Sequence, residues 1–330
     1  MKMKFHKSAF AALAGLALLA TGGQPATAAD FPTKDIVHIM PWSAGGGTDT
    51  VMRTFLHYAE APLGVAIRTQ NITGAQSGVG VLRLMKARPD GYTIGSLTWD
   101  SMITVPYFNL VPGYDTEKLA YLANVTLYPT VLAVNADTPW ETLADFVADA
   151  KANPGKYRLS NAGTAGIWHL HGLDMADKLG IELNHIPFPN GSAAQREALI
   201  SGENEAGALS YATVATAHDA GQVRILAVMA DERDPELPDT PTFKELGYDV
   251  VWGGMRVLAV PADTPKERRD ILIAGFRAAF DDPEFQKKAE ETGMGAFWMA
   301  GEEADAYVRK TQKRAAALLD KLVEEGVIEK

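Results

Sequence analysis

Cysteine is absent from the 330 residues. Its absence excludes disulfide bonds, thiolate metal ligands, a cysteine nucleophile and a lipid anchor on an N-terminal cysteine. Positive charge is also scarce: 31 Lys and Arg residues stand against 41 Asp and Glu residues, which gives a formal net charge of −10. A surface of this sign repels phosphate backbones and anionic lipid head groups. Binding of nucleic acid or of a membrane surface is therefore a poor hypothesis.

Common catalytic motifs are missing as well. The sequence contains no GxSxG, GxxxxGK[ST] or HExxH motif, and no GxGxxG with a following ribose-binding acid. We therefore predict neither an enzyme nor a cofactor. One alternative stays open: an exported hydrolase of a small acid ester or amide, with Asp49, Asp100 and His169 as candidate acid and base groups. His169 and His171 lie two residues apart and do not share a helix face, which argues against a metal site.

The first 29 residues have the pattern of a secretory signal peptide. Three lysines precede an uncharged apolar run, Ala9–Ala20, and the small residues Ala26–Ala28 follow it. The run is too short to span a bilayer. Removal of the three lysines would change the net charge from −10 to −13. We expect cleavage near Ala28 or Ala29 and a monomer that is free in the periplasm, without a lipid anchor.

Strand-like and helix-like segments alternate along the rest of the chain, which is typical of an α/β fold. The pattern restarts near Thr130, so we predict two lobes, each a sheet flanked by helices, with a ligand cleft between them. The predicted boundaries place residues 30–129 and 254–330 in the first lobe and 130–253 in the second. The expected strands are Ile36–Met40, Val65–Gln70, Tyr92–Leu97, Val131–Val134, Tyr157–Ser160, His185–Phe188, Ala206–Tyr211, Val223–Met229 and Val257–Val260, and the expected helices include Thr50–Glu60, Val81–Ala87 and Ile167–Leu179.

Two expected helices begin with a capping-box pattern. Thr138–Glu141 and Thr264–Glu267 each place a threonine before proline and a glutamate three residues after the threonine, so we predict each threonine as the N-cap. The first of these helices should end at Asn153. The last part of the chain should be helical to Val327, interrupted near Gly293–Gly301, and should pack back on the first lobe.

The same glycine-rich turn occurs once in each predicted lobe. GGGTD, residues 45–49, and NAGTAG, residues 161–166, each follow an expected strand and precede an expected helix. Ligands of open α/β sheets bind at the carboxyl ends of strands, where bare helix amides attract anions. A carboxylate fits, because it can accept hydrogen bonds from the amides and from the Thr48 and Thr164 hydroxyls. Alternatively, the glycines only allow helix and strand to pack closely, with Asp49 as a helix cap.

Six motifs in order carry a resemblance to a known family. PWSAGGGTDTVMR, NITGAQSGVG, ARPDGYTIG, SNAGTAGIWHL, LPDTPTFKELG and VPADTP together resemble the solute receptors of tripartite tricarboxylate transporters, the Bug-type periplasmic binding proteins. The resemblance runs from about Asp30 to the C-terminus. It implies a two-lobed periplasmic binding fold, type II-like, that closes on a small carboxylate (a di- or tricarboxylate or an aromatic acid). Membrane permease subunits are the implied partners.

The candidate ligand-binding residues come from these motifs and from the ends of expected strands. Two motifs depart from the family pattern: NAGTAG has Ala165 and Gly166 where Gly and then Ser or Thr is more frequent, and Gln76 and Ser77 replace a usual Gly-Gly pair. The departures leave the identity of the acid open. The candidates are Trp42, Ser43, Ala44, Gly45, Gly46, Gly47, Thr48, Asp49, Ser77, Thr98, Asn161, Gly163, Thr164, Ala165, Gly166, His169, Tyr211 and Arg256.

Several candidates also have structural interpretations. Asp49 could brace the first turn or orient a ligand-bound water, and His169 could be a packing residue. Arg256 could pair with a ligand carboxylate or form a surface or lobe-bridging ion pair. The tryptophans at expected strand ends, Trp99 and Trp168, together with Trp42, could stack on a flat aromatic acid or belong to the core.

Overall fold

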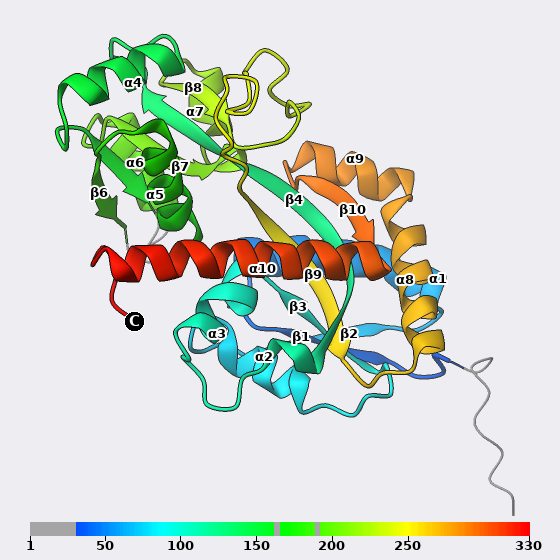
Figure 1. The fold of residues 1–330 in the computed structure, drawn as a ribbon. Helices are drawn as coiled ribbons and strands as arrows, with labels where there is room; N and C mark the ends of the chain where they lie inside the picture. Colours follow the sequence, from blue (N-terminus) through cyan, green and yellow to red (C-terminus); the bar gives the residue numbers. More distant parts are fainter. Residues whose placement is uncertain (1–30, 162–165, 189–191) are drawn as a thin grey trace, which may run out of the picture. The chain divides into compact units, whose positions relative to one another are not determined.

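The structure is a computed structural model that describes residues 31–161, 166–188 and 192–330. The predicted signal peptide and residues 162–165 of the second glycine turn, with the candidates Gly163, Thr164 and Ala165, lie outside the described residues. Residues Phe31–Lys330 form one compact unit. Figure 1 shows their strands and helices.

One half of the sheet is built on three parallel strands. β1 (Ile36–Met40) lies between β2 (Ile67–Asn71) and β3 (Thr93–Leu97), and β9 (Gly253–Pro261) pairs antiparallel with β3. β10 (Ala296–Ala300) pairs with β4. The order of the main path is β2-β1-β3-β9-β4-β7-β5-β6. The mixed α/β architecture that the sequence predicts is therefore confirmed.

The long strand β4 (Leu119–Asn135) belongs to both halves of the sheet (Figure 1). Its residues up to Pro129 pair with β9, and its residues from Thr130 onward pair with β7 (Ala206–Ser210) and β8 (Val223–Val228). In the second half, β5 (Arg158–Asn161) runs parallel to β6 (Asn184–Pro187) and to β7. We call the point where the partners of β4 change, between Pro129 and Thr130, the crossover.

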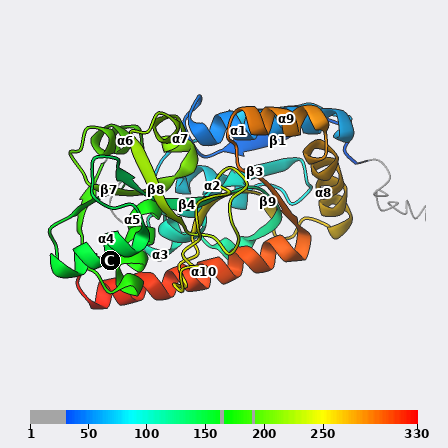
Figure 2. The ribbon, with the colours of Figure 1, turned by 90° about the horizontal axis from the view of Figure 1, so that it is seen from above.

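Helices cover both faces of the first half of the sheet (Figure 2). One face packs on α1 (Gly47–Leu63), α8 (Lys266–Phe280) and α9 (Pro283–Glu291), and their buried side chains share a core with β1 and β9. The other face packs on the short α2 (Gly78–Met85) and the long α10 (Gly301–Glu324). The helices of the second half are α4 (Leu143–Ala152), α5 (Ile167–Leu179), α6 (Ser192–Ile200) and α7 (Tyr211–Asp219), and the short helical turns η2 (Asp100–Thr104), α3 (Val105–Tyr107) and η3 (Thr116–Lys118) link β3 to β4.

α10 contacts both halves of the sheet rather than the first half alone. Gln312 donates to the Met102 carbonyl on the first side at 2.9 Å, while Lys321 pairs with Asp177 of α5 at 2.7 Å. The sequence prediction that the C-terminal helix packs back on the first lobe was therefore incomplete. α10 thus connects α5 to the first half of the sheet.

The predicted helix caps were wrong at both threonines. The hydroxyl of Thr138 donates to the Asn135 carbonyl at 2.7 Å, in the turn that ends β4. Thr142 caps α4 instead, in a capping box with Asp145. α8 starts after Pro265, whose position has no side-chain cap. The hydroxyl of Thr138 is used in the turn at the end of β4 and is not available as a helix cap. Sequence spacing alone does not show this.

The other expected elements agree with the structure, apart from their ends. β1 and α5 have the predicted bounds, and α4 stops at Ala152 with Asn153 as its C-cap, as predicted. The strand expected at Val131–Val134 is only the last part of the 17-residue β4. The interruption expected near Gly293–Gly301 contains the strand β10. Tyr211, predicted at the end of a strand, is the first residue of α7.

Candidate functional site

Three turns lie together at the carboxyl ends of β1, β2 and β3. They are residues 41–46, 72–77 and 98–99, and they meet because the three strands are parallel neighbours. In the first turn Ser43–Gly47 is exposed, whereas the flanking Pro41 and Asp49 are buried. The backbone of this turn is therefore accessible at the edge where α/β sheets bind ligands.

Asp49 braces the first glycine turn from inside. It is 2% exposed, and its carboxylate accepts hydrogen bonds from the Gly45 amide at 2.9 Å and the Asn71 side chain at 2.8 Å. Arg53 pairs with it at 2.9 Å. Burial alone would raise the pKa of Asp49, but the hydrogen bonds from Asn71, Gly45 and Arg53 outweigh burial and lower it. Asn71 also donates to the Trp42 carbonyl at 2.8 Å, so the brace ties both ends of the turn to β2.

The three glycines of this turn have different reasons to be glycine. Gly45 has φ +76°, which other residues adopt at a cost. A Cβ on Gly46 would lie 3.2 Å from the Ser43 carbonyl oxygen, which is a tight contact. A Cβ on Gly47 would meet nothing within 4 Å. Neither conformation nor packing explains Gly47, which is the first residue of α1. Gly46, at the N-cap position, gives that helix no side-chain cap. Space for a ligand remains as an explanation for Gly47.

Ser101, which the sequence analysis missed, joins the other two turns. Its hydroxyl lies 2.8 Å from the Ser77 hydroxyl and accepts from the Thr98 amide at 3.1 Å. The Trp42 indole donates to the Thr98 hydroxyl at 3.3 Å. The candidates Trp42, Ser77 and Thr98 thus belong to one hydrogen-bonded cluster. Ser77 and Thr98 are buried in it, so their side chains position the edge and expose little surface themselves.

The turn after β2 is strained. Ala75, Gln76 and Ser77 have φ of 44°, 50° and 80°, so three successive non-glycine residues are left-handed. Such conformations cost about 1–2 kcal/mol per residue and are concentrated at functional sites.

The glycines of the GVG sequence at residues 78–80, in contrast, are needed for packing. A Cβ on Gly80 would lie 2.4 Å from the Ile72 carbonyl oxygen and 2.9 Å from Pro41 Cβ. We expect Gly80→Ala to lower the free energy of unfolding by about 2 kcal/mol, because overpacking outweighs the helix propensity of alanine. Urea unfolding measures the change. Gly47→Ala is the matched control in open space, and equal stabilities of the two variants would contradict the close approach of α2 to β1.

The second set of candidates lies at the carboxyl ends of β5 and β7. Asn161 ends β5 and is buried, Gly166 is the partly exposed N-cap of α5 without a side-chain cap, and Tyr211 starts α7. His169 is buried in α5, where its ring packs edge-on against His185 at 5.3 Å. Burial lowers the pKa of His169. The structure thus gives His169 a packing contact.

Both sets of strand ends point toward the crossover. The first part of β4 is parallel to β1 and β3, because two antiparallel pairings separate it from β3. β7 is antiparallel to β4 and ends where Ser210 pairs with Thr130. β1–β3 therefore point toward the crossover from one side, and β5–β7 point toward it from the other. This antiparallel arrangement is the main geometric reason to place a binding site there.

Buried aromatic residues join the two sides. Trp99, two residues after the end of β3, has its ring edge-on to His171 of α5 at 4.9 Å and to Trp252 at 5.5 Å. His171 stacks on Trp252 at 5.0 Å, and its Nδ1 lies 2.7 Å from the Thr130 hydroxyl. Trp99 is 2% exposed. It is a core residue at this junction rather than a surface for an aromatic ligand.

Two residues of opposite charge, Asp174 of α5 and Arg314 of α10, complete the junction. The Trp252 indole donates to Asp174 at 2.5 Å, and the Arg314 guanidinium lies 4.0 Å from the centroid of the Trp252 ring. Arg314 also donates to the Val251 carbonyl at 2.9 Å. The sequence offered no signal for this group, because its members lie on three separate segments.

Arg256 lies on β9 near the crossover. It donates to the Thr126 hydroxyl at 3.2 Å, and its guanidinium lies 4.7 Å from the centroid of the Tyr128 ring. The Tyr128 ring also lies near Trp168 of α5, with 6.2 Å between the two ring centroids. Among the described residues Arg256 forms no ion pair with an acid. Its charge is available at the junction.

Asp100 is an acid with a raised pKa at the carboxyl end of β3. It follows Trp99 in the π-helical turn η2, and it is the one partly exposed residue between Ser96 and Val105. Burial raises its pKa to about 6, against a hydrogen bond from Thr104 at 3.3 Å. Asp49 and Asp100 have separate partners and do not form a carboxylate pair.

Other chemical features of the described residues are few. No group of three or more His, Asp or Glu side chains in residues 31–161, 166–188 and 192–330 is arranged to hold a metal ion. Within the same ranges no helix has the length and apolar character needed to cross a membrane.

Comparisons with known proteins identify the family and the fold. A family model described as "Tripartite tricarboxylate transporter family receptor" matches residues 51–323. A Cupriavidus necator protein, "UPF0065 protein in gbd 5'region", is 30% identical over 312 residues, 94% of each chain. The crystal structure of a TctC solute binding protein from Polaromonas is 31% identical, with a TM-score of 0.82 over 88% of this chain and 100% of that one. The periplasmic binding protein BugD is 28% identical, with a TM-score of 0.69 over 88% of this chain and 98% of that one.

Proposed function

Because the chain belongs to the family of tripartite tricarboxylate transporter receptors, we propose that it binds a small carboxylate in the periplasm and delivers it to a membrane permease. The family and the solved relatives are solute-binding receptors with a two-lobed fold. The particular acid, the permease and the residues that touch the ligand are our proposals.

The exposed turn Ser43–Gly47 is the single observation that carries the proposal. It lies at the carboxyl end of β1, is braced from inside by Asp49, and leads into α1 without a side-chain cap. A carboxylate accepts hydrogen bonds from such amides and gains from the positive end of the helix. Gly166, at the start of α5, offers a second helix end on the other side of the crossover. Two such ends suit one carboxylate held from both sides, or the two ends of a dicarboxylate.

We place the hinge at the crossover. The proposed lobes are residues 30–129 with 254–330, and residues 130–253. The pairing change of β4 between Pro129 and Thr130 supports these boundaries. A ligand that touches both lobes would stabilise the closed form through its differential affinity. The permease would then recognise this closed form.

The proposed location is the periplasm after removal of residues 1–29. The signal-peptide pattern of the sequence and the periplasmic receptors of the family support export. We propose that the receptor acts as a monomer. Permease subunits and the small carboxylate are its proposed partners, and nucleic acid is not one of them.

A thermal-shift screen of refolded, ligand-stripped protein tests the function. Two proteins of this fold at 23% and 22% identity hold malate and adipate, so dicarboxylates head a panel that continues with tricarboxylates, aromatic acids and amino acids. At 100 times Kd, linkage predicts about 2.7 kcal/mol of stabilisation. A shift confined to a few related acids supports the receptor. No shift across the whole panel counts against it, and turnover of an ester or amide would favour the hydrolase alternative.

Gly47→Ala separates ligand contact from packing. Since its Cβ meets nothing within 4 Å, we expect the free energy of unfolding without ligand to stay within about 0.5 kcal/mol of wild type or to rise slightly. We expect the Kd of the ligand to rise at least tenfold, because the methyl group occupies the approach to the first amides of α1. Isothermal titration measures the Kd. An unchanged Kd would exclude direct contact at this turn.

A further inference from the structure

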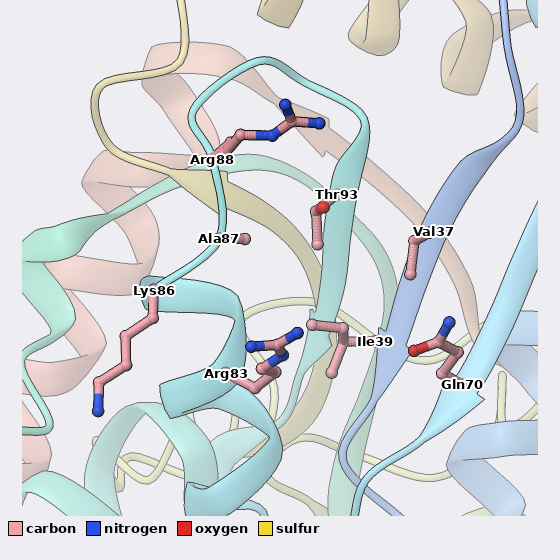
Figure 3. Close-up of a pocket in the computed structure, with 8 residues that line it drawn as sticks. All are labelled: Val37, Ile39, Gln70, Arg83, Lys86, Ala87, Arg88 and Thr93. Carbon is pink, nitrogen blue, oxygen red and sulfur yellow. The ribbon is translucent and has the colours of Figure 1, made fainter.

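A basic hollow lies beside α2, away from the carboxyl edge (Figure 3). It has a volume of about 340 Å³, and its floor is formed by Val37, Ile39 and Thr93 of β1 and β3. Thr93 is the first residue of its strand, so the hollow extends toward the amino ends. Its lining contains no residue of the three turns at the carboxyl ends of these strands, although Ile39 and Gln70 lie one residue before those ends.

The short length of α2 leaves this part of the sheet uncovered. α2 has 8 residues, whereas α1 on the opposite face has 17. At 1.5 Å per residue, α2 spans only about 12 Å, and the chain then turns away through residues 86–92. Val37 and Thr93 are consequently only half-buried. A partly apolar sheet face is thus accessible from outside.

Cations surround this floor. Arg83, Lys86 and Arg88 line the hollow, and Gln70 of β2 adds an amide. Figure 3 shows the Arg83 and Arg88 side chains beside the strands and Lys86 pointing away from them. Arg88 lies 3.4 Å from Asp90. Among the described residues, Arg83 and Lys86 take part in no ion pair, although the protein has an excess of ten acids.

Stabilisation of a helix end explains only part of this cluster. Cations in the last turn of a helix interact favourably with its carbonyls, which accounts for Arg83 and Lys86. Arg88 lies beyond the end of α2, and the helix dipole does not require an open sheet face beneath the cations. A basic rim around a half-buried apolar floor fits acidic side chains that flank an apolar one.

We propose that the basic hollow docks an acidic, partly apolar segment of the membrane permease. The proposal rests on the proposed receptor function, and it names a surface of the first lobe by which the permease holds the receptor, in addition to the contacts that distinguish the closed form. Arg83 and Arg88 would each hold a carboxylate, while an apolar side chain of the permease would contact Val37 and Thr93. A docking site with this lining leaves the turns of the proposed carboxylate site free, because it includes none of their residues.

The shape and charge of the protein favour a protein segment over a lipid surface. The hollow is concave, so a flat bilayer would not reach its floor. Three basic residues contribute roughly 1 kcal/mol each near an anionic membrane, and the net charge of −10 opposes that attraction. A protruding acidic segment can reach the floor while the rest of the surface stays apart.

Uptake into proteoliposomes tests the docking site. The vesicles contain the membrane subunits of the tripartite tricarboxylate transporter from the same genome, and purified receptor loaded with the acid found in the screen is added at increasing concentration. We expect Arg83→Glu with Arg88→Glu to raise the half-saturating receptor concentration at least tenfold. The Kd of the acid should stay within twofold of wild type. Higher salt should weaken docking of the wild type and have little effect on the double variant.

The control and the possible outcomes keep the two proposals apart. Lys287→Glu with Lys288→Glu makes the same charge change on α9, on the opposite face of the sheet, and should leave uptake unchanged. Normal uptake with the Arg83 and Arg88 double variant overturns the docking site while the receptor function stands. A wild-type protein that neither binds an acid nor supports uptake overturns the receptor function and the docking site with it. The wild type could also float with anionic vesicles that contain no permease, and the double variant could fail to do so. That result would overturn the permease as the partner and show that the hollow binds lipid.

Discussion

Acidification from pH 7.5 to 5 is expected to lower the free energy of unfolding by at least about 3 kcal/mol. Three histidines whose pKa is lowered by burial cause most of the loss, and the lowered pKa of His169 acts in the same direction. His38 is fully buried on β1, with Nε2 2.7 Å from the Ser96 hydroxyl and Nδ1 3.1 Å from the Thr69 hydroxyl. Burial, reinforced by the charge of Arg53, lowers the pKa of His38 to about 3. Burial and the neighbouring His169 lower the pKa of His185 to about 4, and burial and Arg314 lower that of His171 well below its ordinary value.

The direction follows from proton binding in the two states. Between pH 6.5 and these lowered values the unfolded chain binds a proton at each histidine and the folded chain does not. Unfolding therefore takes up protons, and stability falls as the pH falls. At pH 5, His38 and His185 account for about 2 kcal/mol each, and His171 adds to the loss in the same direction. Asp100 acts in the opposite direction, because its raised pKa of about 6 makes the folded state bind a proton first, which offsets roughly 1 kcal/mol.

Urea unfolding at pH 7.5, 6.5, 5.5 and 5 measures this dependence. The slope near pH 5.5 should correspond to a net uptake of about two protons, because each of the three histidines takes up nearly one proton and Asp100 releases most of one. His38→Gln is the control, since glutamine is neutral at every pH and can still bond to Ser96. This variant should be less stable at pH 7.5 and should lose about 2 kcal/mol less on acidification than wild type. A wild-type stability that is flat from pH 7.5 to 5 would show that these histidines are protonated in the folded state.

Asp49→Ala is expected to have the second large effect, on stability and on ligand binding together. The substitution removes the acceptor for the Gly45 amide and the Asn71 side chain and leaves Arg53 without its partner. Loss of a buried acid that accepts several hydrogen bonds costs about 3 kcal/mol. The turn Ser43–Gly47 then loses its brace, so its amides are no longer preorganised. We expect the Kd of the ligand to rise at least tenfold.

Arg53→Ala is the matched control for this experiment. The Arg53 side chain is 44% exposed, whereas that of Asp49 is 3% exposed, so its pair with Asp49 is worth at most about 1 kcal/mol. Its removal leaves the hydrogen bonds from Gly45 and Asn71 in place. We expect a small loss of stability and a Kd within threefold of wild type. If Asp49→Ala loses stability but keeps the wild-type Kd, the brace supports the fold and the first turn does not bind the ligand.

Much of the fold could be predicted because its signals are local. β1 and α5 have the bounds expected from the sequence, since an apolar run or a helical period between glycine-rich turns lies within a few neighbouring residues. The length of β4 was missed, because its first half, Leu119–Pro129, gains its strand conformation from pairing with β9 far along the chain. The caps were missed for a similar reason: the hydroxyl of Thr138 is used by the turn at the end of β4, and Thr142 is free to cap α4.

By itself the sequence determined the α/β class, the order of strand, glycine turn and helix, and the turns on which a site was to be sought. Only the tertiary structure decided which residues meet there. Asn71 reaches Asp49 across 22 positions, and Trp252 reaches Asp174 across 78. Ser101 joins Ser77 to Thr98. Such contacts depend on strand order and direction, which arise when distant segments pack together, and no single stretch of sequence records them.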